Sequence, residues 1–126
     1  MVTGASSGIG FELAKLLAKD GFDLVLVARS RERLKTIARA LQNTSGIKAY
    51  TISSDLSEPG AASRIHRSLK QEGIRVDLLV NNAGFGSYGE FVRTRPETMN
   101  EMVQVNVGAV VHLTRRLDER TNPRRY

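Results

Sequence analysis

Thr3-Gly4-Ala5-Ser6-Ser7-Gly8-Ile9-Gly10 is the stretch that decides the fold, because it joins a short apolar segment to a helical pattern. Glycines in such a turn let the backbone approach a pyrophosphate, and the helix N-terminus offers N–H groups and a positive dipole. The spacing is G-x-x-x-G-x-G, not the G-x-G-x-x-G of other dinucleotide folds. Glycine-rich turns also occur for steric reasons alone, so the turn by itself does not identify a phosphate site. The elements that follow it provide the further evidence.

Strand and helix patterns alternate along the rest of the chain. Residues 23–28 (DLVLVA) and 76–80 (VDLLV) are apolar runs typical of parallel strands covered on both faces, and 48–53 is predicted as a further strand. Helices are predicted over residues 8–19, 31–41, about 58–72 and about 96–117. This alternation predicts an α/β fold: a Rossmann-type doubly wound parallel sheet in three layers, with helices on both faces. Residues 1–3 provide only a stub of the first strand, so we expect an incomplete sheet of about four strands in the order 3-2-1-4.

Composition limits the partners that we expect. The chain has 126 residues, enough for one domain, and no cysteine, which excludes disulfides and fits a cytoplasmic location. No apolar run approaches the roughly 20 residues that span a bilayer, so no membrane partner is expected. The net charge of +6 comes largely from clusters at residues 29–35 and 115–126. Neither cluster is interleaved with aromatic residues, so no nucleic-acid partner is expected.

Four motifs in order, each at the end of a predicted strand, together resemble the short-chain dehydrogenase/reductase family. They are TGASSGIG at 3–10, Arg29, Asp55-Leu56 and Asn81-Asn82-Ala83-Gly84. The similarity runs from Val2 to about Arg116. It implies an oxidoreductase fold that transfers a hydride between NADPH and a small-molecule carbonyl or alcohol.

The resemblance also implies which residues contact the dinucleotide, at the carboxyl ends of the strands where open α/β sheets bind ligands. Asp55 and Leu56 are implied as adenine contacts, and Val105 is implied to face the cofactor. The expected cofactor-binding residues are Gly4, Ser6, Ser7, Gly8, Ile9, Gly10, Arg29, Ser30, Asp55, Leu56, Asn82, Ala83, Gly84 and Val105.

Arg29 indicates which dinucleotide is preferred. A fold that prefers NAD carries Asp or Glu about 20 residues beyond the glycines, where it binds the ribose 2′-hydroxyl. Here that position holds arginine, which can pair with a 2′-phosphate, and Ser30 adds a hydroxyl donor. NADP is therefore predicted in preference to NAD. The alternative is that Arg29 only begins a solvated helix.

Asn106 is the one catalytic candidate. An amide in the middle of a helix is intrinsically unfavourable because it competes for backbone hydrogen bonds. By resemblance, Asn106 is the asparagine that holds a water in the family's proton relay. His66 and His112 each stand alone on predicted helices, so no metal site is expected.

The sequence departs from the family pattern where acid–base chemistry would come. The family uses a tyrosine with a lysine four residues later, but Tyr50 and Tyr88 are followed at that spacing by Ser54 and Val92. A fifth strand with its serine is also missing. We therefore expect residues 1–117 to form an NADP-binding half-domain and 118–126 a polar tail outside the family pattern. General acid catalysis contributes about 10²–10⁴-fold, so the chain alone is predicted to be inactive.

Other functions remain open at this point. The chain could be a non-catalytic dinucleotide-binding or interaction module rather than part of an enzyme. A basic nucleic-acid-binding fragment is a third hypothesis, which rests on net charge alone. Self-association through the last predicted helix is a further expectation.

Overall fold

The computed structural model describes residues 1–118. These residues divide between two compact units. The first unit comprises Met1–Asp55 and Asp77–Ala83, and the second comprises Leu56–Val76 and the chain from Gly84 onward. The predicted polar tail lies outside the described residues, apart from Asp118.

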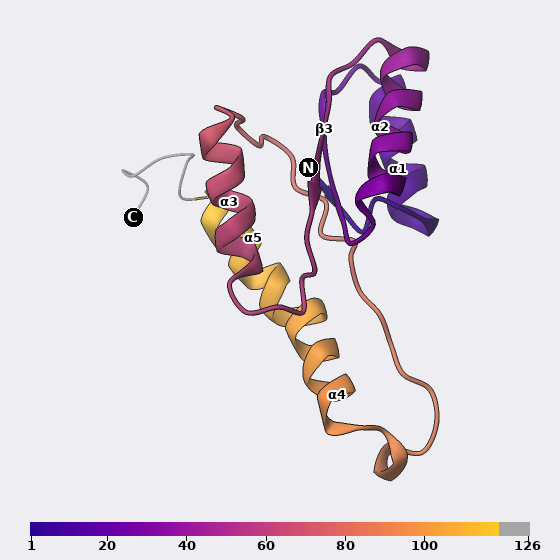
Figure 1. Ribbon diagram of the computed structural model, residues 1–126, viewed down its shortest axis with the longest axis vertical. Coiled ribbons are helices and arrows are strands. Elements are labelled where there is room, and N and C mark those ends of the chain that lie inside the picture. Colours follow the sequence, from indigo (N-terminus) through magenta and orange to yellow (C-terminus); the bar gives the residue numbers. More distant parts are fainter. Residues whose placement is uncertain (119–126) are drawn as a thin grey trace. The chain divides into compact units, whose positions relative to one another are not determined.

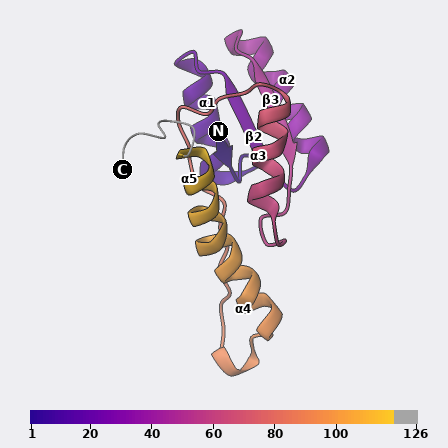
Figure 2. The same ribbon diagram turned by 90° about the vertical axis from the view of Figure 1, so that its left-hand side faces the viewer.

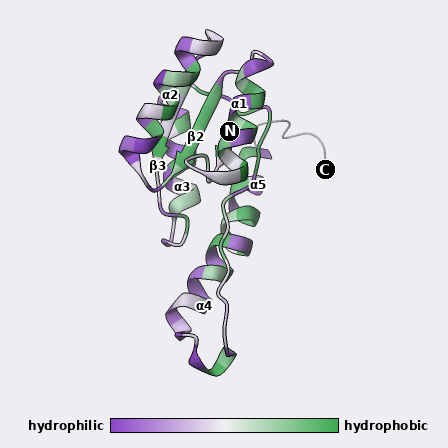
Figure 3. Cartoon of the chain, turned by 90° about the vertical axis from the view of Figure 1, so that its right-hand side faces the viewer, coloured by the Kyte–Doolittle hydropathy of each residue, from purple (hydrophilic) through white to green (hydrophobic). Residues whose placement is uncertain are grey.

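A parallel sheet forms the centre of the first unit. It consists of β1 (Val2–Thr3), β2 (Leu24–Ala28) and β3 (Ala49–Ser53), in the order β1-β2-β3. The register pairs Val2 with Leu26, and Leu24 with Ala49. All five residues of β2 are buried, and Figure 3 shows that strand as hydrophobic. The apolar run DLVLVA therefore forms the covered parallel strand that its composition predicts.

The fourth predicted strand is present only as a short pairing. Over residues 76–80, Val80 alone forms a parallel bridge, with Val2. Three hydrogen bonds join the two segments. The Met1 amine donates to the Leu78 carbonyl at 2.6 Å, and Val80 N–H donates to the Met1 carbonyl at 2.8 Å. Thr3 N–H donates to the Val80 carbonyl at 3.0 Å. Because β1 has only two residues, a neighbouring strand can form only a few backbone hydrogen bonds with it. The segment lies beside β1, while the full order 3-2-1-4 stays a prediction.

Two helices cover one face of this sheet (Figure 1). α1 spans Gly8–Lys19, and α2 spans Arg31–Ser45. α2 runs four residues beyond its predicted end, because the turn that stops it is at Gly46, whose φ is +67°. The buried face of α2 carries Leu34, Ile37, Ala38 and Leu41, which join the core of the first unit.

The second unit is helical. α3 spans Ala61–Gln71, and a short 3₁₀ turn, η1, spans Phe91–Arg93. The long helix predicted from Pro96 forms as α4 (Pro96–Val103), a π-helical stretch η2 (Gln104–Ala109) and α5 (Val110–Asp118), and Figure 2 shows it as one rod. α5 packs against α3, and its Leu113 and Leu117 are buried. Across residues 1–118, no helix has the length and apolarity that crossing a bilayer requires.

The α-amino group of Met1 should make stability depend on pH. Burial lowers the pKa of this amine from 8.0 to about 6, against the opposing influence of the Asp77 carboxylate. The unfolded chain then binds more protons than the folded chain between pH 6 and 8, so stability rises with pH through this window. In a chain with a free Met1 amine, we expect the free energy of unfolding to increase by about 2 kcal/mol from pH 6 to pH 8.

Urea denaturation across this range measures the effect. Histidine side chains ordinarily change charge in this range of pH, so the same series is run on a variant carrying His66→Gln and His112→Gln. A rise that disappears in that variant would assign the pH dependence to the histidines and contradict the role of the amine.

Candidate functional site

The glycine turn has the backbone geometry of a phosphate-binding loop. Gly4 and Gly8 have φ of +66° and +54°, values that residues with a side chain rarely adopt. Gly10 is needed for a different reason. A Cβ there would lie 2.4 Å from the Gly4 carbonyl oxygen and 2.3 Å from the Asn82 amide nitrogen. The first turn of α1 thus packs directly on the backbone of the loop.

Hydrogen bonds of Thr3 and Asn82 hold this loop in place. The backbone N–H groups of Asn82 and Ala83 each donate to the buried Thr3 hydroxyl at 3.0 Å. The Asn82 side-chain amide donates to the carbonyls of Thr3 at 3.1 Å and Gly4 at 3.4 Å. Sequence analysis placed Asn82 among the cofactor contacts. In the structure its amide supports the turn, and the backbone of 82–83 is held beside it.

The outer side of the loop is open. Ser7, Gly8 and Ile9 are exposed, and Ile9 is 73% exposed. Apart from its chain neighbours and the backbone of its own helix, no heavy atom of the described residues would lie within 4 Å of a Cβ at Gly8. Among residues 1–118, none of the first-turn N–H groups of α1 is capped by the Ser7 side chain, and that turn carries no acidic residue. An open, uncapped and uncharged helix N-terminus next to a glycine cradle fits a pyrophosphate.

Arg29 and Ser30 follow β2 at the same edge of the sheet. Both are exposed. The Ser53 hydroxyl donates to the Arg29 carbonyl at 2.8 Å, which ties this position to the end of β3. Ser30 caps α2 by accepting from Arg33 N–H at 3.4 Å, so its own hydroxyl proton remains available to donate to an acceptor. The guanidinium and the hydroxyl therefore stand at the end of a rigid, buried strand.

The predicted site residues fall in both units. Gly4, Ser6, Ser7, Gly8, Ile9, Gly10, Arg29, Ser30, Asp55, Asn82 and Ala83 belong to the first unit, and Leu56, Gly84, Val105 and Asn106 to the second. Leu56 and Val105 are buried, and Asp55 is half-buried and has an interaction partner. The assignment of Asp55, Leu56 and Val105 to the cofactor stays a prediction.

Asn106 is held by the backbone of the loop that follows Gly84. Its Oδ1 accepts from Phe85 N–H at 3.1 Å, and its Nδ2 donates to the Phe85 carbonyl at 2.8 Å. A Cβ at Gly84 would lie 3.0 Å from Oδ1, so this approach is close. Asn106 lies within the π-helical stretch η2, a local irregularity that is frequent at functional sites. Both polar atoms of its side chain thus anchor the loop.

Two residues of this arrangement were missed by sequence reasoning. Thr3 was interpreted only as the end of a strand. Its hydroxyl, next to a glycine turn, could have been predicted to form a hydrogen bond that holds the turn. Phe85 takes part through its backbone, which leaves no trace in the sequence.

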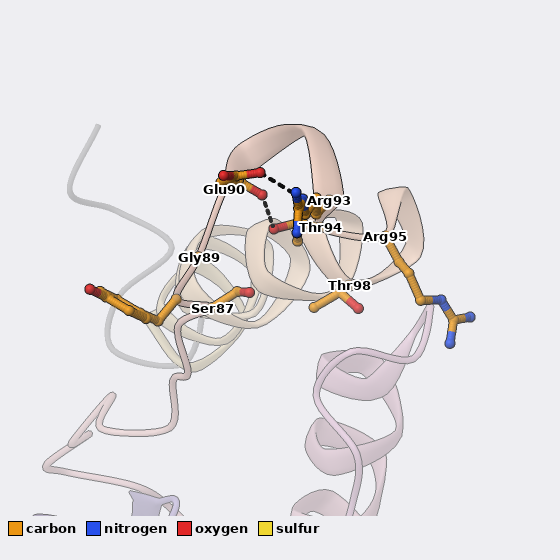
Figure 4. Close-up of a pocket in the computed structure, with 8 residues that line it drawn as sticks. Ser87, Gly89, Glu90, Arg93, Thr94, Arg95 and Thr98 are labelled. Carbon is orange, nitrogen blue, oxygen red and sulfur yellow. Dashed lines mark hydrogen bonds and ion pairs between the residues drawn. The ribbon is translucent and has the colours of Figure 1, made fainter.

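An open cavity of about 480 Å³ lies beyond this loop in the second unit (Figure 4). Its lining residues are Ser87, Tyr88, Gly89, Glu90, Arg93, Thr94, Arg95 and Thr98. Glu90 pairs with Arg93 at 2.6 Å, and Arg95 pairs with Glu97 at 3.5 Å. The charges that face the cavity are therefore largely balanced within the lining and its neighbour. Within the described part of the chain, no group of three or more His, Cys, Asp or Glu is placed to hold a metal ion.

Comparison with known proteins gives a family match over most of the chain. The family model described as "short chain dehydrogenase" matches residues 1–120. The chain is 37% identical over 119 residues to very-long-chain 3-oxoacyl-CoA reductase-A of Danio rerio. The alignment covers 91% of this chain and 37% of that protein. It therefore spans little more than a third of the length of this curated relative.

Solved structures show the same fold. A short-chain dehydrogenase from Sphingobium yanoikuyae in complex with NADPH matches with a TM-score of 0.87 and 35% identity, over 94% of this chain and 46% of that one. L-sorbose reductase from Gluconobacter frateurii, complexed with NADPH and L-sorbose, matches with a TM-score of 0.87 and 35% identity. That match covers 94% of this chain and 45% of the reductase.

Substitution of Gly10 should test the packing of the loop. In Gly10→Ala the new Cβ meets a backbone carbonyl and the clamped Asn82 amide, so we expect a loss of about 2–3 kcal/mol in the free energy of unfolding. The matched control is Gly8→Ala, which strains the backbone at positive φ but meets no neighbour, and should cost about 1 kcal/mol. Chemical denaturation measures both. Equal losses in the two variants would show that crowding at Gly10 is unimportant.

Substitution of Asn106 should release the loop at Phe85. In Asn106→Ala both side-chain hydrogen bonds are lost, and we expect hydrogen exchange of the Phe85 amide to accelerate by about tenfold. Asn106→Asp keeps an acceptor for that amide and should retain more of the protection. NMR-detected exchange measures the rates. Unchanged exchange in Asn106→Ala would contradict the anchoring role.

Proposed function

The chain belongs to the short-chain dehydrogenase family, and from that premise we propose that its first unit binds NADP. The observation that carries this proposal is the loop itself: a glycine turn clamped by Thr3 and Asn82, open above the uncapped first turn of α1. The similarity to dehydrogenases solved with NADPH supports it.

Each part of the loop has a defined task in this proposal. The N–H groups of Gly8, Ile9 and Gly10 donate to the pyrophosphate oxygens, and the helix dipole favours their negative charge. Gly4, Ser6 and Ser7 border the adjoining ribose. Asp55 contacts the adenine, and Asn82 and Ala83 border the middle of the cofactor.

Arg29 and Ser30 select the phosphorylated cofactor. The guanidinium pairs with the 2′-phosphate in a charge-assisted, bidentate contact, and the Ser30 hydroxyl donates a further hydrogen bond. Because Arg29 follows a buried strand and its carbonyl is bound by Ser53, its backbone position is set before the ligand arrives. A carboxylate at this position would instead repel the 2′-phosphate, so NAD is the disfavoured cofactor.

The reaction that we propose is hydride transfer between NADPH and a small-molecule carbonyl or alcohol. NADPH supplies the hydride when bound. Asn106 contributes by holding the backbone of the loop at Phe85. A proton donor at the carbonyl oxygen is also required, and the 126 residues contain no tyrosine followed four residues later by lysine.

A second candidate is a dinucleotide-binding module that does not itself catalyse. Both candidates use the same NADP site in the first unit. They are distinguished by adding a carbonyl compound to the chain and NADPH. The enzyme oxidises NADPH under these conditions, whereas the binding module does not. A cytoplasmic location belongs to either proposal and is supported by the lack of cysteine.

Arg29→Asp tests the cofactor preference. A charge-assisted hydrogen bond is worth about 1.5–3 kcal/mol, so we expect the variant to bind NADPH about 10- to 100-fold more weakly while its affinity for NADH stays equal or rises. Fluorescence titration of both nucleotides measures the change.

Arg39→Asp is the matched control, because it removes an exposed arginine from α2, about two turns beyond the start of that helix. Equal affinity of the unsubstituted chain for NADPH and NADH would refute the role of Arg29. Failure of both nucleotides to bind would refute the site in the first unit.

A further inference from the structure

An arginine-rich segment follows β2 in the first unit. Residues 29–33 (RSRER) are all exposed. We call Arg29, Arg31 and Arg33 the arginine cluster. Within residues 1–118, no carboxylate forms an ion pair with any of the three. The one acidic residue of the segment, Glu32, pairs instead with Lys35 at 3.6 Å. The cluster therefore carries three guanidinium groups without a carboxylate partner in the described part of the chain.

The arginine cluster is larger than the 2′-phosphate of one cofactor requires. The proposed function gives that phosphate to Arg29 and Ser30, and it leaves Arg31 and Arg33 without a task. Both of these arginines lie next to Ser30 in another sense. Arg31 follows it directly, and Arg33 is the third residue of α2, from which a side chain can reach back to the capping residue. That capping residue is Ser30, whose Oγ accepts from Arg33 N–H at 3.4 Å. The cluster is thus centred on the Ser30 hydroxyl.

We propose that Ser30 is a phosphorylation site and that its phosphate blocks NADP binding by the first unit, an inference that rests on the proposed function. A phosphoserine carries a charge of about −1.5 to −2 at neutral pH, and arginines beside it form charge-assisted hydrogen bonds to its oxygens. The phosphate therefore pairs with the arginine cluster, occupies Arg29 and repels the 2′-phosphate of the cofactor. NADH lacks the 2′-phosphate, so its binding changes much less. The modification acts on the preference between the two cofactors.

The modifying reaction is transfer of the γ-phosphoryl group of ATP by a protein kinase. The Ser30 Oγ forms a bond to the γ-phosphorus, while the bond between that phosphorus and the oxygen bridging it to the β-phosphate breaks, and ADP leaves. The hydroxyl proton passes to the carboxylate base of the kinase. Because the arginine cluster flanks the reacting hydroxyl, a kinase with an acidic substrate groove is complementary to this segment.

Ser30 is accessible to such an enzyme. It is exposed, and its backbone is extended, with φ of −81° and ψ of 101°. The residues that follow form the first turn of α2, whose N–H groups have no acceptor within the helix, so opening this turn on an enzyme costs few hydrogen bonds. Ser53, at the end of β3, is different because its hydroxyl already donates to the Arg29 carbonyl at 2.8 Å.

Installing phosphoserine at residue 30 of the full chain tests the consequence for binding. By fluorescence titration, we expect NADPH to bind about 10- to 100-fold more weakly than to the unmodified chain, and the affinity for NADH to change by less than about threefold. Phosphoserine at residue 63 is the matched control. Ser63 also lies beside arginines, with Arg64 next to it and Arg67 one turn further on, but it belongs to α3 in the second unit. This control should leave both affinities unchanged.

Two further measurements do not depend on the affinity for the cofactor. With ATP labelled at its γ-phosphorus and a protein kinase that selects serine beside arginine, we expect the unmodified chain to be labelled at Ser30 and Ser30→Ala to lose this label. In the nucleotide-free chain, ³¹P NMR follows the ionisation of the phosphate on residue 30. Arg29→Gln combined with Arg33→Gln should shift this ionisation to higher pH, because the guanidinium groups favour the dianion. Arg39→Gln should not shift it.

Three outcomes would overturn the inference while the proposed function stands. Equal NADPH affinity with and without phosphate on Ser30 would show that the phosphate does not compete with the cofactor. Equal weakening of NADPH and NADH would show that it distorts the site instead of replacing the 2′-phosphate. Labelling that spares Ser30 would show that the segment is not a kinase substrate. Failure of the unmodified chain to bind either nucleotide is a separate result, which refutes the proposed function and the inference together.

Discussion

The clamp between Thr3 and Asn82 is the interaction on which the candidate site depends. One buried hydroxyl accepts from two successive backbone N–H groups, and one side-chain amide donates to two carbonyls of the glycine turn. Residues almost 80 positions apart in the sequence are joined in this way. Because the same amide would collide with any Cβ at residue 10, the clamp also explains why the third residue of α1 is glycine.

The second unit repeats this strategy at a different place. Asn106 again uses both polar atoms of an amide on the backbone of a loop, here at Phe85. Asn82 holds the glycine turn through two carbonyls, and Asn106 holds the backbone at Phe85. These amides are largely committed to the protein, so the ligand contacts that we propose there come mainly from backbone N–H groups and from the exposed Arg29 and Ser30.

The sequence predicted the regular elements well, because their periodicity and their stops are local. The bounds of α1 are those predicted, and β2 and β3 each differ by one residue at the start. Other features depend on tertiary contacts. The shortness of β1 limits the pairing of residues 78–80, and the π-helical stretch around Asn106 has no periodic signature. Family resemblance predicts that Asn106 holds a water, and this stays a prediction. Its bonds to Phe85 could not be predicted, because they follow from a loop conformation.

The most direct test of the account is to map NADPH binding residue by residue with amide NMR shifts of the unsubstituted chain. We expect the largest shifts at residues 7–10 and 29–30, with smaller ones at 82–83. A saturable response confined to other residues, for example Arg64, Arg67 and Lys70 of α3, would contradict the assignment of the dinucleotide site to the glycine turn.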